Sequence, residues 1–276
     1  MAFKEILVYA DATKSADARY EVAVNLAKAH DAHLVSLRVA EPPYVYVDAG
    51  MAVPPAAIEW QEEYQRQQTE ATKKGIDTVV ARTGRQIEWR ADRGDIVDRV
   101  LLHSRYADLV VASQSGAEDN EDADADRLPE SVVLGAGRPT LLVPRFGKFP
   151  KLGENVLVAW NRTREATRAV HDALPLLVKA RKVTVMEVNP ESGRAPHMPG
   201  ADIAQHLARH GVNAEASSVV GADIEVGDMI LSRLVDLGAD LLVMGAYGHS
   251  RLREFAFGGA TRHLLRHMTV PVLMSH

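Results

Sequence analysis

The sequence predicts two tandem α/β domains, each built on a doubly wound parallel sheet of roughly five strands. Two observations carry this prediction: the chain repeats itself, and short apolar runs alternate with amphipathic stretches in both copies. Strands that alternate with helices form parallel sheets covered on both faces, a Rossmann-like arrangement. The length of 276 residues also suits two domains of ordinary size.

The repeat is clearest at the fourth apolar run of each copy. ADLVVASQSG at 107–116 aligns without a gap with ADLLVMGAYG at 239–248, an offset of 239 − 107 = 132. Near the start of each copy, EILVYAD at 5–11 aligns with NVLVAWN at 155–161, an offset of 155 − 5 = 150. The first copy therefore holds 150 − 132 = 18 extra residues, which we place in the Pro- and Tyr-rich stretch 41–60.

The repeat sets the expected domains at 1–147 and 153–276, joined near RFGKFPKLG. Expected strands are 6–9, 34–39, 87–91, 109–112 and 140–144 in the first copy, and 156–160, 183–188, 214–220, 241–244 and 270–274 in the second. Expected helices include 16–30, 57–74, 95–105, 164–180, 228–237 and 260–267. In such open sheets, ligands bind beyond the carboxyl ends of the strands. The residues that follow the first, second and fourth strands are therefore the candidates for a site.

Composition excludes several classes of protein. The absence of cysteine excludes disulfides, thiolate zinc sites, iron–sulfur clusters and cysteine nucleophiles. A net charge of −5 argues against nucleic acid and anionic membranes as partners. No apolar run approaches the ~20 residues that span a bilayer, and the first residues do not resemble a signal peptide. We therefore expect a cytoplasmic protein with no membrane partner.

A glycine-rich stretch, GAYGHSRLREFAFGGATRHLLRH at 245–267, follows the fourth strand of the second copy. Glycine permits backbone amides to approach an anion closely. Gly258 and Gly259 precede the expected helix 260–267, whose free N-terminal amides favour a phosphate. His249, Arg251 and Arg253 add positive charge. The alternative, turn glycines ahead of an ordinary helix, carries equal weight on these residues alone, because the spacing matches neither GxGxxG nor a Walker loop.

This Gly-x2-Gly-x9-Gly pattern after a fourth strand resembles the nucleotide-binding loop of the universal stress protein family, and the repeat resembles a tandem member. The resemblance covers nearly the whole chain and implies adenine nucleotide alpha hydrolase-like domains. It implies ATP or another adenine nucleotide as the ligand, with Mg²⁺ as a candidate companion. The implied nucleotide-binding residues are Asn161, Val188, Gly245, Gly248, His249, Gly258, Gly259 and Ala260.

The family pattern and this sequence differ at two positions. Family members that bind ATP have Ser or Thr after the third glycine, where this chain has Gly259. The family's aspartate after strand one corresponds to Asn161, which can bond a ribose hydroxyl but supports Mg²⁺ weakly. Val188 matches the residue whose backbone reads the adenine edge. Simpler interpretations are a helix N-cap for Asn161 and a strand core residue for Val188.

The first copy lacks the glycine loop. Ser113 replaces the first glycine, and the following segment has six acidic residues, at positions 118, 119, 121, 122, 124 and 126. Such a loop repels a polyphosphate. It also lacks the glycine and glutamate of a calcium-binding EF-hand loop. We expect the first copy, in which Asp11 matches Asn161, to keep the fold and bind no ATP.

The resemblance implies a stress-response protein that binds an adenine nucleotide in its second copy. No general base or nucleophile is evident, so we expect no catalysis beyond slow ATP hydrolysis. Two alternatives remain: a nucleotide-free interaction module, favoured by Gly259 and Asn161, and a weak ATPase, disfavoured by the missing Walker lysine. The copies are expected to pack through their final strands as single-domain members pair, and a homodimer of the whole chain stays open.

Overall fold

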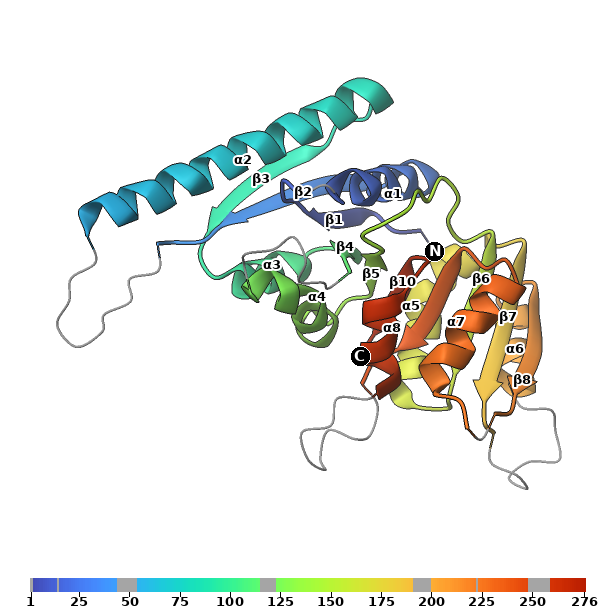
Figure 1. Ribbon diagram of the computed structural model, residues 1–276. Coiled ribbons are helices and arrows are strands. Elements are labelled where there is room, and N and C mark those ends of the chain that lie inside the picture. The colour runs from blue at the N-terminus through green and yellow to red at the C-terminus, as the bar shows by residue number, and fades with distance from the viewer. Residues whose placement is uncertain are drawn as a thin grey trace.

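The computed structural model describes residues 2–13, 15–43, 54–114, 123–190, 200–221, 223–247 and 259–276, with 123–126 described in backbone only. We refer to residues 2–147 as the N-terminal half and to residues 153–276 as the C-terminal half. Each half is a layered α/β unit, and the two sheets run together into one ten-stranded sheet (Figure 1).

Both halves alternate strands with helices. The elements of the N-terminal half are β1 (Glu5–Tyr9), α1 (Ala16–His30), β2 (His33–Ala40), α2 (Pro55–Thr83), β3 (Glu88–Arg93), α3 (Ile96–Ser104), β4 (Leu109–Ser113), α4 (Ala123–Gly135) and β5 (Thr140–Val143). Those of the C-terminal half are β6 (Asn155–Trp160), α5 (Arg164–Leu177), β7 (Lys182–Val188), α6 (Ala201–Arg209), β8 (Ala214–Val219), α7 (Val226–Asp236), β9 (Leu241–Gly245), α8 (Gly259–His267) and β10 (Val272–Ser275). The predicted α/β class and tandem arrangement are confirmed.

The sheet order is β3-β2-β1-β4-β5-β10-β9-β6-β7-β8. Neighbouring strands within each half are parallel, and β5 pairs antiparallel with β10, with Leu141 opposite Leu273. Both leucines are fully buried, so the pairing excludes water as well as satisfying backbone groups. The prediction that the copies join through their final strands is confirmed.

The apolar strand runs are explained by burial on both faces of the sheet. One apolar cluster lies under α1, α2, α5 and α6 and continues across both halves. Two other clusters lie on the opposite face, under α3 and α4 in the N-terminal half and mainly under α7 and α8 in the C-terminal half. Helix α3 starts at a side-chain cap, because Asp95 accepts a hydrogen bond from Asp98 N at 2.8 Å.

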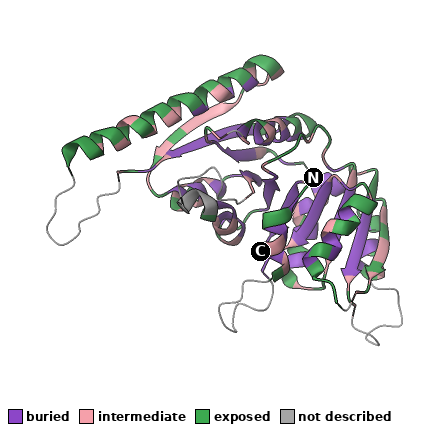
Figure 2. Cartoon of the chain, in the orientation of Figure 1, coloured by how far each residue is buried: buried purple, intermediate pink, exposed green. Residues whose placement is uncertain are grey.

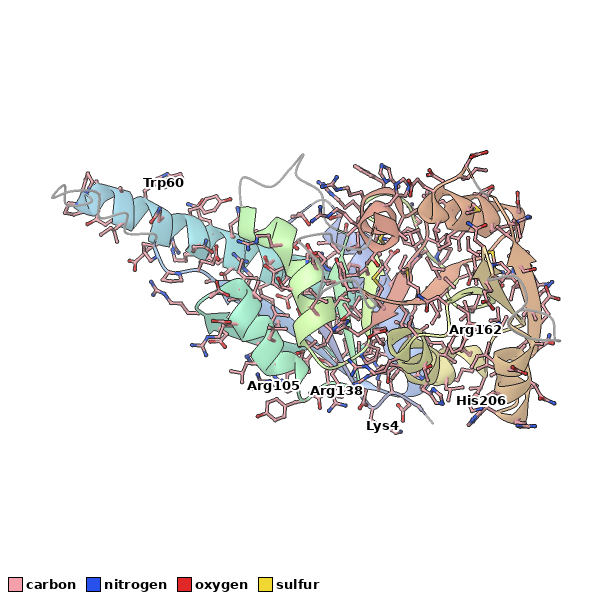
Figure 3. The ribbon with its side chains drawn as sticks, turned by 90° about the horizontal axis from the view of Figure 1, so that it is seen from below. Lys4, Trp60, Arg105, Arg138, Arg162 and His206 are labelled. Carbon is pink, nitrogen blue, oxygen red and sulfur yellow. The ribbon has the colours of Figure 1, made fainter. Side chains whose placement is uncertain are left out.

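Helix α2 accounts for most of the extra length of the N-terminal half. It has 29 residues, whereas its counterpart α6 has nine. The placement of the surplus in 41–60 was therefore wrong in part, because α2 continues through Gly75 and ends only at its C-cap Gly84 (φ +66°); residues 44–53 lie outside the described part. The first turns of α2 extend beyond the sheet and are exposed (Figures 2 and 3), and the ring of Trp60 is stacked on Tyr64 at 5.7 Å.

Within the described ranges, no helix combines the length and the apolar character needed to cross a membrane.

Candidate functional site

Three of the predicted site residues lie at the carboxyl ends of neighbouring strands. Strand β6 lies between β9 and β7, and Asn161 follows β6 directly. Val188 is the last residue of β7 and Gly245 the last of β9. The topology therefore brings these three positions to one edge of the C-terminal half. Gly259 and Ala260 begin α8, and Gly248, His249 and Gly258 lie outside the described residues.

Asn161 organises the start of α5. Its Oδ1 accepts hydrogen bonds from Thr163 N at 3.3 Å and from Thr163 Oγ1 at 2.8 Å. Thr163 in turn is the N-cap, because its Oγ1 accepts from Ala166 N at 3.2 Å. The amide NH₂ group of Asn161 donates to no residue in the described ranges, and the side chain is exposed. Asn161 thus holds a turn with its oxygen and presents donors to solvent.

The backbone is strained where these strands end. Among the described residues, four that are not glycine have a positive φ: Asp31, Arg162, Asn189 and Tyr247. The last three, at +62°, +46° and +54°, follow the ends of β6, β7 and β9, whereas Asp31 is the C-cap of α1. Left-handed conformations of such residues cost about 1–3 kcal/mol and gather at functional sites. This concentration marks the strand ends of the C-terminal half as a candidate site.

Gly245 has a packing role that spacing alone does not indicate. A Cβ atom added there would lie 2.4 Å from Ala166 N and 2.5 Å from the carbonyl carbon of Glu165. Both atoms belong to the backbone of α5, which cannot move aside easily. The end of β9 therefore approaches the first turn of α5 only because residue 245 has no side chain.

An ion pair that sequence reasoning missed lies beside these residues. Arg162 donates from Nη2 to Glu187 Oε2 at 3.2 Å, and Glu187 is only 7% exposed at the end of β7. Tyr247, two residues beyond β9, is also buried and donates from its hydroxyl to Glu130 Oε1 of α4 at 3.0 Å. The candidate site is thus connected to the N-terminal half.

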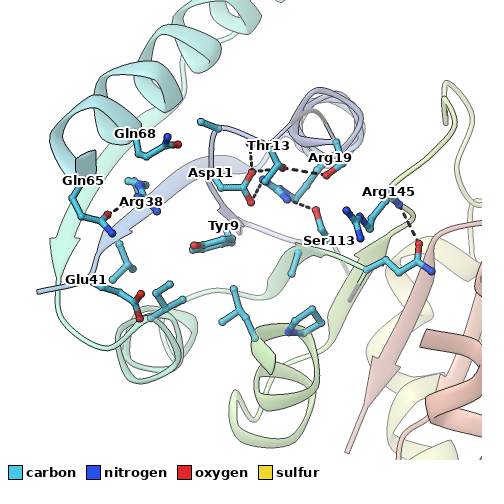
Figure 4. A pocket seen from close by; sticks show the side chains of 18 of the residues that line it. Tyr9, Asp11, Thr13, Arg19, Arg38, Glu41, Gln65, Gln68, Ser113 and Arg145 are labelled. Carbon is cyan, nitrogen blue, oxygen red and sulfur yellow. Dashed lines mark hydrogen bonds and ion pairs between the residues drawn. The ribbon is translucent and has the colours of Figure 1, made fainter. Parts of the chain in front are cut away.

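The N-terminal half contains a cavity of about 730 Å³ at the equivalent end of its own strands. It lies between β1, β2, β4 and the middle of α2, with Tyr9 at its centre (Figure 4). Sequence reasoning did not predict it. The available signal was Arg38, a charged residue inside the otherwise largely apolar strand HLVSLRVA, and its side chain is buried.

Arg19 and Asp11 form a buried ion pair on the wall of this cavity. Arg19 Nη2 lies 2.9 Å from Asp11 Oδ2, Nη1 donates to Ser113 Oγ, and the guanidinium lies over the Tyr9 and Tyr20 rings. Burial raises the pKa of Asp11, but Arg19 and the hydrogen bonds from Thr13 outweigh it, so the pKa lies below its ordinary value. Asp11 is therefore ionised at neutral pH and forms its ion pair with Arg19.

Comparison with known proteins agrees with this doubled architecture. The sequence model of the universal stress protein family matches two segments, residues 2–144 and 153–276. The chain belongs to the universal stress protein family.

Universal stress protein Slr1230 of Synechocystis is 33% identical over 148 residues, which cover 52% of this chain and 49% of that protein. The chain therefore spans about half the length of this curated relative. A universal stress protein from Archaeoglobus fulgidus has a similar fold, with a TM-score of 0.74 at 16% identity, covering 98% of this chain and 95% of its own. A universal stress protein solved in complex with cAMP matches 45% of this chain and 97% of its own at 20% identity, with a TM-score of 0.33.

Proposed function

We propose that the C-terminal half binds one adenine nucleotide, ATP, ADP or AMP, and that the chain acts in stress adaptation as a binding protein. The concentration of left-handed residues at the ends of β6, β7 and β9 carries the proposal. Family membership supports it, as does the Gly-x2-Gly-x9-Gly pattern that starts at Gly245.

The described residues fit such a ligand at two points. The free amide donors of Asn161 suit a ribose hydroxyl, because its oxygen is already used by Thr163. The helix α8 begins at Gly259, where no described residue lies within 4 Å of an added Cβ, and we propose that its first amides face the phosphate. A phosphate at a helix N-terminus is stabilised by those amides and by the helix dipole. Asn161 carries no charge for Mg²⁺, so we propose binding that depends weakly on the metal.

The test is a matched pair of substitutions in the two halves. Gly248→Asp adds a negative charge to the proposed phosphate loop, and Gly116→Asp adds the same charge at the aligned position of the N-terminal half. Nucleotides released from freshly denatured protein are counted by ion exchange, and ATP, ADP, AMP and cAMP are titrated by calorimetry. We expect about one nucleotide per chain in the parent and in Gly116→Asp, and none in Gly248→Asp. Full binding by Gly248→Asp would overturn the assignment.

A nucleotide-free interaction module is the second candidate. The hydrogen bond between Tyr247 and Glu130 favours it, because it uses the start of the glycine loop to join the two halves. In that case the parent protein releases no nucleotide and shows no heat of binding with any of the four ligands, with or without Mg²⁺.

A further inference from the structure

We infer that the N-terminal cavity is a second ligand site, and that it takes an organic monoanion with an aromatic or apolar body. This site is separate from the proposed nucleotide site and differs from it in chemistry. Its volume of about 730 Å³ lies within the range of small-molecule sites, roughly 300–1,000 Å³. The side chains that project into it differ from those at the same register positions of the C-terminal half.

Arg38 is the residue that points to a bound anion. It lies on β2, lines the cavity and is 7% exposed. Its Nη2 donates to Gln65 Oε1 of α2 at 2.9 Å, while its buried Nε has no hydrogen-bond partner among the described residues. A buried cationic donor without an acceptor is costly, so a ligand oxygen at this place would satisfy it. Figure 4 shows the guanidinium beside Gln65, on the α2 side of the cavity.

The remaining walls suit an apolar or aromatic body. The lining includes Val39, Ile96, Leu128 and Pro129 as well as the ring of Tyr9. Burial raises the pKa of the Tyr9 phenol far above its usual range, so this ring stays neutral and adds no competing charge. An aromatic ligand can stack on it, and its hydroxyl supplies one polar contact.

The charges on the walls favour one negative charge rather than several. Among the lining residues that the structure describes, three are arginines and two are carboxylates, which gives this part of the lining a formal charge of +1. Arg19 is committed to Asp11, and Arg145 lies over the Phe146 ring at 5.9 Å. A polyphosphate would bring several negative charges close to Asp11 and Glu41, which repel it. A single carboxylate or sulfonate next to Arg38 matches the available charge.

The experiment uses two probes of nearly the same shape on the full chain. Calorimetry at pH 7 compares 1-naphthylacetate with its uncharged amide, 1-naphthylacetamide. We expect one naphthylacetate per chain, with the amide at least ten times weaker. Arg38→Met is expected to weaken naphthylacetate roughly ten- to a hundredfold, since a hydrogen bond to a charged group is lost, and to leave the amide nearly unchanged. Arg82→Met is the control, because Arg82 is exposed and pairs with Glu21 away from the cavity.

A second variant keeps the test valid if Arg38→Met does not fold. Gln68 lies on the cavity side of α2 and is only partly buried, so Gln68→Trp should fill the cavity without disturbing the core. It is expected to abolish binding of both probes. Equal affinity for the two probes in the parent, or unchanged naphthylacetate binding in a folded Arg38→Met, would overturn the proposal.

Competition with ATP separates this inference from the proposed function. We expect ATP to leave naphthylacetate binding unchanged, and Arg38→Met to leave ATP binding unchanged. Displacement of naphthylacetate by one equivalent of ATP that persists in Gly248→Asp would make the N-terminal cavity a nucleotide site and refute the monoanion assignment. Loss of ATP binding alone in Gly248→Asp leaves the inference standing.

Discussion

The two halves share one backbone plan and differ in the side chains at their strand ends. The strand pairing aligns β1, β2 and β4 with β6, β7 and β9 residue by residue. The residues that correspond are Tyr9 and Ala159, Asp11 and Asn161, Arg19 and Ala169, Arg38 and Glu187, and Ser113 and Gly245. In the N-terminal half these positions carry a buried ion pair, an aromatic ring and an arginine. In the C-terminal half they carry small residues and an acid.

The backbone at the strand ends differs as well. Arg162 and Asn189 have left-handed φ values, whereas their counterparts Ala12 and Ala40 do not. The C-terminal half therefore tolerates strain that the N-terminal half avoids, which is expected where backbone amides are positioned for a ligand. The repeated fold thus keeps the location of a candidate site at the strand ends, while the side chains there, and with them the ligands that we propose for the two halves, differ.

Exchanging the residues at the Asp11 position should have the largest effect on stability. Asp11→Asn gives the N-terminal half the residue of the C-terminal half but leaves the buried Arg19 charge without its partner. We expect the free energy of unfolding to fall by about 3–5 kcal/mol, the range for breaking a buried pair. Urea denaturation measures the change.

The reverse exchange, Asn161→Asp, should cost less than about 1 kcal/mol, because Asn161 is exposed and its acceptor role toward Thr163 is kept. The double variant Asp11→Asn with Arg19→Ala should lose less than the sum of the single changes. Additive losses would show that Arg19 and Asp11 do not act as a pair.

His30 should make the stability of the N-terminal half depend on pH. Burial, followed by the charges of Lys179 and the N-terminus, lowers the pKa of His30 from 6.5 to about 4. Because the unfolded chain takes up the proton first, stability should be full above pH 6.5 and decline as the pH falls toward 4. The expected loss is up to about 3 kcal/mol.

The C-terminal half has no histidine at the end of α5, so His30 has no counterpart there, although burial also lowers the pKa of His206 in α6. Denaturation of His30→Met between pH 7 and 4.5 should show a flatter profile than the parent, while the exposed His33→Gln should keep the parent's decline. A parent profile that is already flat would contradict the assignment.

Gly245 and Ser113 occupy equivalent positions, and exchanging the two residue types should lower the stability of the protein by unequal amounts. Gly245→Ser places a Cβ atom within 2.5 Å of the α5 backbone, so we expect a loss of roughly 2–3 kcal/mol from overpacking. Ser113→Gly removes only the acceptor for Arg19 and should cost about 1 kcal/mol. Thermal denaturation of the two variants tests the difference, and equal costs would mean that β9 can move away from α5.

The fold could be predicted from the sequence because its main signals are local. Strands such as Leu109–Ser113 and Leu241–Gly245 are apolar runs buried on both faces, so they stand out without knowledge of their neighbours. That Asn161, Val188 and Gly245 meet at one edge could be predicted because the carboxyl ends of parallel strands lie together, whereas their role toward a nucleotide stays a prediction. Placing these residues at one edge requires only the order of the strands in the sheet.

The N-terminal cavity could not be predicted in the same way. Arg19 lies in ADARYEVAV, where a charged residue on an amphipathic helix normally faces solvent, and only the packed structure shows it fully buried. The Arg162–Glu187 pair likewise depends on two strands meeting, and neither residue belongs to a recognisable motif. A position-by-position alignment of the two copies would have drawn attention to Arg38, because the equivalent residue of the second copy is an acid, Glu187.

The smallest predicted effect concerns the contact between the halves. Tyr247→Phe removes the hydrogen bond from the candidate site to Glu130 of α4 while keeping the buried ring. We expect a loss of about 1 kcal/mol in the free energy of unfolding. A double-mutant cycle with Glu130→Ala isolates the pair, because alanine cannot accept the bond, and a coupling energy near zero would contradict a direct bond. If nucleotide binding changes the coupling, the bond also links the state of the C-terminal site to the N-terminal half, because such linkage is reciprocal. Repeating the cycle with saturating ATP therefore tests whether the two halves communicate through Tyr247.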